Sequence, residues 1–159
     1  MKRARPLMFA RVISVLMTLL LLGFIFANSA QTAAVSAYRS GTVTQQLSGL
    51  LNFNGSTLPL EKLIRKLAHF AEYTALGVCL TALLAAFFCT LRLWPAALLG
   101  GASAAFCDEI IQFFTPGRSC ELRDMLLDTC GVGFGIFCIF AGCNIFSALW
   151  RRFAPRRFL

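Results

Sequence analysis

Long apolar runs separated by short polar stretches dominate this chain. Four of these runs cover about residues 7–27, 62–91, 94–114 and 122–150. A helix that crosses a membrane needs about 20 mainly apolar residues, and each run reaches about that length. The pattern therefore predicts an all-α fold: an integral membrane four-helix bundle, built as a single domain over residues 1–159.

The first run has two interpretations. Counted from residue 7, with Arg11 snorkelling toward the membrane surface, it is long enough for a transmembrane anchor. The alternative is a signal peptide that is cleaved near residues 28–30. Asn28 fits the small-x-small cleavage pattern poorly, which favours the anchor. Either interpretation delivers residue 31 to the far side of the membrane.

The stretch between the first two spans, residues 31–61, is polar and contains Ser, Thr, Gln and Gly throughout. Within it, Val43, Leu47 and Leu50 fall loosely at helical spacing, which indicates a short helix lying on the membrane surface. Residues 52–59 then form the loop that terminates this helix. We therefore expect a short extracytoplasmic segment between helices 1 and 2 of the bundle.

The composition agrees with a membrane protein. Hydrophobic residues make up 58% of the chain and charged residues only 14%, and the mean hydropathy is +0.72. A soluble domain of this size cannot hide so much apolar surface in its core. The net charge of +8 comes from short clusters beside apolar runs rather than from a basic surface stripe, so nucleic acid is excluded as a partner. Six of the seven cysteines lie inside apolar runs without a zinc-binding spacing, and we predict neither disulfides nor a cofactor.

The basic residues also predict an orientation, because loops on the cytoplasmic side of a membrane carry an excess of Lys and Arg. With a cytoplasmic amino terminus, nine cations and no acid lie on the inner side, whereas six cations and all seven acids lie on the outer side. We therefore expect a multi-pass protein of the bacterial plasma membrane with both termini in the cytoplasm. The inner cations are Lys2, Arg3, Arg5, Arg11, Arg92, Arg151, Arg152, Arg156 and Arg157.

Polar residues gather at the outer end of three spans and in the turn that joins two of them. At about 1.5 Å of rise per residue, they lie within roughly 10 Å of the outer helix ends. An ionisable side chain at the centre of a bilayer costs roughly 3 kcal/mol or more, so such residues indicate a functional site facing the outside. The candidate catalytic residues are His69, Asp108, Glu109, Arg118 and Asp124, and the candidate binding residues are Lys66, Glu72, Tyr73, Gln112 and Asp128.

Small residues lie on the same helix faces as the candidate site residues, farther along each helix. His69 lines up with Gly77, and Asp128 lines up with Gly135. Because small-residue stripes mark where membrane helices approach closely, we expect the polar groups to point into the bundle and form a cup open to the outside. The alternative is structural: charges near helix ends snorkel, and an inward polar network can simply hold a bundle together.

The polar residues belong to short motifs spread along the chain. These motifs are KLAHF at residues 66–70 with Tyr73 and Leu76-Gly77, then Asp108-Glu109 with Gln112, then Pro116-Gly117-Arg118, and finally Asp124 with Gly131. They resemble the VanZ-like family of small membrane proteins over roughly residues 28–135. One position departs, because the family pattern commonly has Asn where this chain has Asp128. The resemblance implies an association with resistance to teicoplanin-type glycopeptide antibiotics at the cell envelope, without identifying an activity.

Two functions are compatible with such a cup. In the first, the protein is an enzyme acting on membrane lipids or on a lipid-linked anionic envelope precursor. Arg118 then clamps a phosphate, His69 acts as general base or nucleophile, and Asp108 or Asp124 orients the imidazole. In the second, the cup and the polar residues 31–61 bind a lipid, an antibiotic or a partner protein without chemistry.

Two further possibilities have weaker support. A divalent metal held by His69, Glu72 and the aspartates lacks a recognised ligand spacing, so no metal is predicted. Ion or proton translocation through an oligomer needs titratable groups in the inner half of the bundle, where only Arg11 and Arg92 are ionisable.

Overall fold

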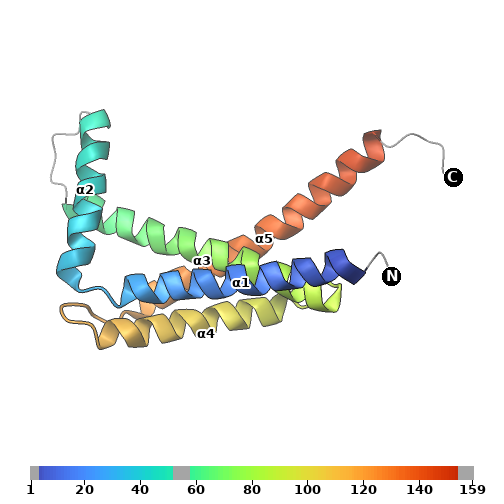
Figure 1. Ribbon diagram of the computed structural model, residues 1–159. Coiled ribbons are helices and arrows are strands. Elements are labelled where there is room, and N and C mark those ends of the chain that lie inside the picture. Colours follow the sequence, from blue (N-terminus) through green and yellow to red (C-terminus); the bar gives the residue numbers. More distant parts are fainter. Residues whose placement is uncertain (1–3, 52–57, 154–159) are drawn as a thin grey trace.

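The chain folds into five helices and, in the part that the structure describes, contains no strand. The computed structural model describes residues 4–51 and 58–153. The helices are α1 (Ala4–Ser29), α2 (Ala33–Leu51), α3 (Leu58–Phe88), α4 (Trp94–Phe113) and α5 (Leu122–Phe153), as Figure 1 shows. The predicted all-α class is thereby confirmed.

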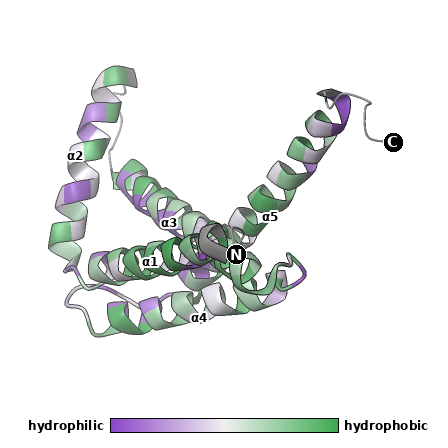
Figure 2. Ribbon diagram, turned by 45° about the vertical axis from the view of Figure 1, so that its right-hand side comes forward, coloured by the Kyte–Doolittle hydropathy of each residue, from purple (hydrophilic) through white to green (hydrophobic). Residues whose placement is uncertain are grey.

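Four helices, all except α2, are long and apolar enough to cross a membrane. Large apolar side chains such as Leu20, Leu99 and Phe146 lie exposed on the outer faces of these helices, where lipid rather than water is the natural solvent. Apolar residues cover most of α1 and α5 in Figure 2, whereas hydrophilic residues are frequent along α2. The protein is therefore a multi-pass membrane protein, as its hydrophobic runs predicted.

The boundaries of α3 differ most from the expected ones. The helix begins at Leu58 rather than at residue 62, and Pro59 lies in its first turn, where the missing N–H removes no helical hydrogen bond. The prediction of a loop over residues 52–59 is therefore wrong for its last two residues, and residues 52–57 lie outside the described part. The helix ends at Phe88 because Cys89, with a φ of 53°, adopts the left-handed conformation that terminates helices.

Different segments of the chain lie at the two ends of the bundle. The start of α1 and the carboxyl end of α5 lie at one end of the bundle, whereas α2 and the turn over residues 114–121 lie at the other (Figure 1). Near the chain ends, the Nε of Arg11 donates a hydrogen bond to the carbonyl oxygen of Ala86 at 3.0 Å, and its guanidinium lies 5.3 Å from the ring centroid of Phe87. Arg11 therefore caps the carboxyl end of α3 and ties it to α1.

The closest helix pair is α3 and α5, whose backbones meet at glycines. A Cβ atom added at Gly77 would collide with the backbone of Val132, and one at Gly135 with the carbonyl oxygen of Thr74. At Gly131 it would lie 2.8 Å from the carbonyl oxygen of Phe70. This close approach, predicted from the small-residue stripes, brings the polar faces of the two helices together.

We expect Gly135→Ala to lower the melting temperature of the detergent-solubilised protein, because the added methyl group forces α3 and α5 apart at a cost of about 1 to 3 kcal/mol. Gly142→Ala is the matched control on the same helix, since nothing lies within 4 Å of a Cβ at that position. Alanine forms helix better than glycine, so the control should melt at the same temperature or slightly higher. Equal destabilisation by both changes would contradict the close packing at Gly135.

Candidate functional site

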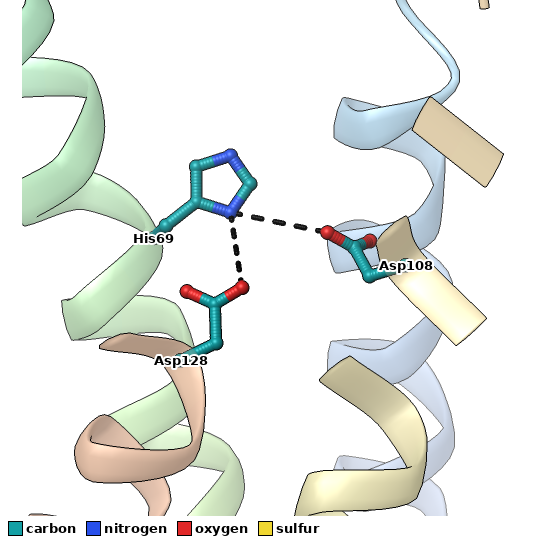
Figure 3. Close-up of side chains that lie close together, drawn as sticks. All are labelled: His69, Asp108 and Asp128. Atoms are coloured by element: carbon teal, nitrogen blue, oxygen red, sulfur yellow. Dashed lines mark ion pairs between the residues drawn. The ribbon is translucent and has the colours of Figure 1, made fainter. Parts of the chain in front are cut away.

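The centre of the polar site is a cluster of three side chains from three different helices, shown in Figure 3. His69 of α3 turns its Nδ1 atom toward Oδ2 of Asp108 on α4, at 4.0 Å, and toward Oδ2 of Asp128 on α5, at 3.9 Å. The side chain of His69 is 17% exposed, and those of the two aspartates are 0% and 1% exposed. We call these three residues the buried cluster.

The hydrogen bonds of the two aspartates differ. Oδ2 of Asp108 accepts a hydrogen bond from Nε2 of Gln112, one helical turn away, at 2.9 Å. Within the described residues, neither carboxylate oxygen of Asp128 meets a hydrogen-bond donor. The distances to His69 exceed those of a hydrogen bond, so the three groups are held near one another without direct bonding.

A cavity of about 90 Å³ opens beside the buried cluster. Its walls come from α3, α5, the end of α4 and the turn between α4 and α5, and we call it the rim cavity. Six of the residues predicted for the site line it: Lys66, His69, Gln112, Arg118, Asp124 and Asp128. The remaining four predicted residues, Glu72, Tyr73, Asp108 and Glu109, lie outside its lining.

The turn over residues 114–121 places Arg118 over this cavity. Gly117 has a φ of 77°, a conformation that glycine adopts without strain, and the backbone N–H of Ala33 donates a hydrogen bond to the carbonyl oxygen of Pro116 at 3.3 Å. The hydroxyl of Thr115 bonds to the carbonyl oxygen of Ile111, which continues α4 into the turn. The position of Arg118 is therefore fixed by contacts on both sides of the turn.

Arg65 and Arg118 give the rim cavity a cationic wall. Burial, and next the charge of nearby Arg65, hold the pKa of Arg118 below its ordinary value. Among the described residues, neither guanidinium forms an ion pair with a carboxylate, and Nε of Arg118 is buried without a hydrogen-bond acceptor. Two neighbouring cations without an anionic partner favour the binding of an anion between them.

The two aspartates of α5 have different neighbours. Asp124 accepts a hydrogen bond from the ammonium group of Lys66 in a half-exposed ion pair. Asp128, one turn farther along the helix, faces His69 instead. Of the two acids expected to orient the imidazole, the structure therefore places only Asp108 beside it, and the second acid is Asp128 rather than Asp124.

Three predicted residues, Glu72, Tyr73 and Glu109, lie outside both the rim cavity and the buried cluster. Oε1 of Glu72 accepts a hydrogen bond from the side-chain amide of Asn28 on α1 at 3.1 Å. Oε2 of Glu109 accepts one from the backbone N–H of Glu121, just before α5, at 2.7 Å. Tyr73 is completely buried in the core. Glu72 and Glu109 therefore connect α3 and α4 to neighbouring segments, and Glu72 also lines the groove described next.

A second groove, of about 190 Å³, lies between α2 and α3. It has a more apolar lining, with Val43, Ile64 and Ala68 among its walls, and it also includes Arg39. Three residues line both the groove and the rim cavity: Arg65, His69 and Arg118. The same polar side chains can therefore be reached from two directions.

Sequence reasoning missed several residues of the site. The motifs did not include Arg65, although its spacing of four residues from His69 places it on the same helix face. Asn28 was considered only as a cleavage-site residue. Arg39 lies in a polar segment without a motif, so nothing in the sequence singles it out.

Comparison with known proteins gives one match. A family model described as VanZ/LLP1 matches residues 14–146, which include every residue of the buried cluster and of both cavity linings. No curated protein and no solved structure matches the chain significantly.

Proposed function

The chain belongs to the VanZ/LLP1 family, as its motifs indicated, and on this premise we propose that it is an envelope enzyme of the bacterial plasma membrane. Its substrate is the phosphate group of a membrane lipid or of a lipid-linked envelope precursor. Its site faces the outside of the cell, and its activity contributes to tolerance of teicoplanin-type glycopeptides.

The distribution of charge supports the outward orientation. The turn between α3 and α4, which holds Arg92, and the carboxyl end of α5, which holds Arg151 and Arg152, lie at the same end of the bundle as the start of α1. The carboxyl end of α4 and the start of α5, which hold the aspartates of the site, lie at the opposite end. Because cytoplasmic ends of membrane proteins carry an excess of Lys and Arg, the end with the buried cluster then faces outward.

One observation carries the proposed substrate class. Arg65 and Arg118 line a cavity next to an acid–imidazole cluster, and neither arginine has a carboxylate partner among the described residues. Arginine presents a planar set of donors that matches two oxygens of a phosphate. A phosphate held there would lie beside His69, which lines the same cavity.

The buried cluster supplies the acid–base chemistry that phosphoryl transfer needs. Water or a hydroxyl group attacks the phosphorus atom, the bond to the leaving oxygen breaks, and the attacking oxygen releases its proton to the cluster. Nδ1 of His69 faces the two aspartates, so Nε2, on the opposite edge of the ring, is the atom available to the substrate (Figure 3). The two arginines stabilise the charge that develops on the phosphate oxygens.

The groove between α2 and α3 gives such a substrate a path from the membrane. Its apolar wall, with Val43, Ile64 and Ala68, suits the first carbons of a lipid chain, and Arg65 and Arg118 at its polar end suit the phosphate. This groove also favours a second candidate function, in which the protein binds a lipid or an antibiotic's lipid tail without reacting with it.

Expression in a glycopeptide-susceptible bacterium separates the two functions. We expect the wild-type chain to raise tolerance and to change the amount of at least one lipid-linked precursor. Asp108→Asn, which keeps the shape of the side chain, should lower both effects by about 10-fold or more, because the cluster loses an acid. Glu61→Gln, at an acid outside both cavities, is the control at matched expression.

The two functions predict different patterns in this experiment. Raised tolerance with unchanged lipids supports binding and contradicts catalysis. Equal protection by the wild-type chain and by Asp108→Asn contradicts the assignment of the site.

A further inference from the structure

The donor atoms of the buried cluster have the arrangement of an ion-binding site. One ring nitrogen of His69 and one carboxylate oxygen each from Asp108 and Asp128 lie within 4.8 Å of one another. They come from three helices that are packed through the core, so their positions are set by the fold rather than by a flexible loop. We propose that these three side chains bind a single divalent cation.

Asp128 provides an independent reason to expect a ligand. Its side chain is 1% exposed, points toward His69 in Figure 3, and has no hydrogen-bond donor within reach of either oxygen among the described residues. A buried carboxylate without a partner is strongly unfavourable, since each unpaired buried ion costs several kcal/mol. A cation between Asp108 and Asp128 supplies the missing partner for Asp128 and a counter-charge for Asp108.

The neighbouring cations Lys66 and Arg118 do not neutralise the two buried aspartates. Lys66 is paired with Asp124. Arg118 lies in the cavity wall and forms no ion pair with either aspartate of the buried cluster. With a neutral imidazole and both carboxyl groups ionised, the buried cluster would carry two negative charges, which one divalent ion balances.

The distances fit direct coordination after small side-chain movements. Donor atoms at about 2.1 to 2.4 Å from a divalent ion lie roughly 3.4 to 3.9 Å apart at tetrahedral angles. Nδ1 of His69 lies 4.0 Å from Oδ2 of Asp108 and 3.9 Å from Oδ2 of Asp128. The two distances to Nδ1 therefore nearly fit the longer metal–donor distances of this range, and the two carboxylate oxygens lie within 4.8 Å of each other. Smaller ions require a contraction of about half an ångström.

The donor types narrow the choice of ion. Carboxylates suit Mg²⁺, Ca²⁺ and Mn²⁺, whereas imidazole suits transition metals, so one imidazole with two carboxylates favours Mn²⁺ or Zn²⁺. Three protein ligands leave positions open for water, which a bound cation makes more acidic. With Nδ1 on the cation, Nε2 of the neutral imidazole carries the ring proton, so the bound water would replace His69 as the base. This catalytic consequence depends on the proposed function, whereas cation binding itself does not.

Electron paramagnetic resonance with Mn²⁺ alone tests the inference. Mn²⁺ is the probe because the seven cysteines of the chain bind Zn²⁺ far better than they bind Mn²⁺. The full chain, purified in detergent without a histidine tag, should bind one Mn²⁺ and show a nitrogen hyperfine coupling. His69 is the only histidine of the chain, so an imidazole coupling identifies it as the ligand.

Substitutions locate the ion independently of the spectrum. Asp128→Asn should weaken Mn²⁺ binding at least about 10-fold, as even outer-shell changes weaken metal sites by about 10- to 100-fold. Glu61→Gln, at an acid outside the cluster, should bind like the wild type. If the wild-type chain binds no Mn²⁺, lacks the nitrogen coupling, or binds as tightly after Asp128→Asn, the inference is overturned. The spectrum of the wild-type chain decides the question even if a variant fails to fold, and no lipid substrate enters the experiment.

Discussion

His69→Gln is expected to reduce turnover of a phosphate-bearing lipid by about 1000-fold, because glutamine keeps a polar side chain but cannot accept and release a proton. In the part of the chain that the structure describes, the imidazole is the one titratable group that lines the rim cavity, lines the groove between α2 and α3, and faces both buried aspartates. The loss should therefore appear in kcat and leave the affinity for the lipid within a few-fold of the wild-type value.

The measurement is steady-state turnover of the purified variant in vesicles, with thermal melting to show that it is folded. A folded His69→Gln variant with wild-type turnover would contradict any chemical role of the buried cluster. A variant that loses affinity while keeping kcat would indicate that His69 only binds the substrate.

Arg118→Lys is expected to lower kcat/KM by about 10- to 100-fold, although it preserves the charge. A hydrogen bond to a charged group contributes about 1.5 to 3 kcal/mol, and lysine cannot reproduce the two parallel bonds of a guanidinium with a phosphate. Lysine carries the same positive charge as arginine, so the repulsion from Arg65 that helps to lower the pKa of Arg118 stays much the same in the variant. Folding should therefore be unaffected.

Arg123→Lys is the matched control, since Arg123 is exposed at the start of α5 and lies outside both cavity linings. Its kcat/KM should equal that of the wild type. If Arg118→Lys and Arg123→Lys have the same kcat/KM, Arg118 does not bind the phosphate through two parallel hydrogen bonds.

The membrane-spanning helices could be predicted from the sequence because the length of an apolar run is a local property. The run over residues 94–114 became α4, at Trp94–Phe113, almost without change. The start of α3 was misplaced because Leu58 and Pro59 follow a polar stretch, where a proline reads equally well as a loop residue or as the first turn of a helix.

The sequence predicted which helix ends contribute residues to the candidate site. It did not predict which of these residues face one another. Depth along a helix follows from the rise per residue, so His69, Asp108 and Asp128 were expected in one region. Whether Asp124 or Asp128 faces the imidazole depends on the crossing of α3 and α5, which the glycine contacts determine. Such contacts join residues far apart in the sequence.

Incubation of the purified chain with vesicles made from bacterial envelope lipids tests the central claim most directly. Phosphorus NMR and mass spectrometry of the extracted lipids then report any change in a phosphate group. We predict that the wild-type chain converts at least one phosphate-bearing lipid, that His69→Gln binds this lipid without converting it, and that Arg118→Lys converts it slowly. If the folded wild-type protein neither binds nor alters any phosphate-bearing lipid in these vesicles, the proposal that it acts on such a lipid is contradicted.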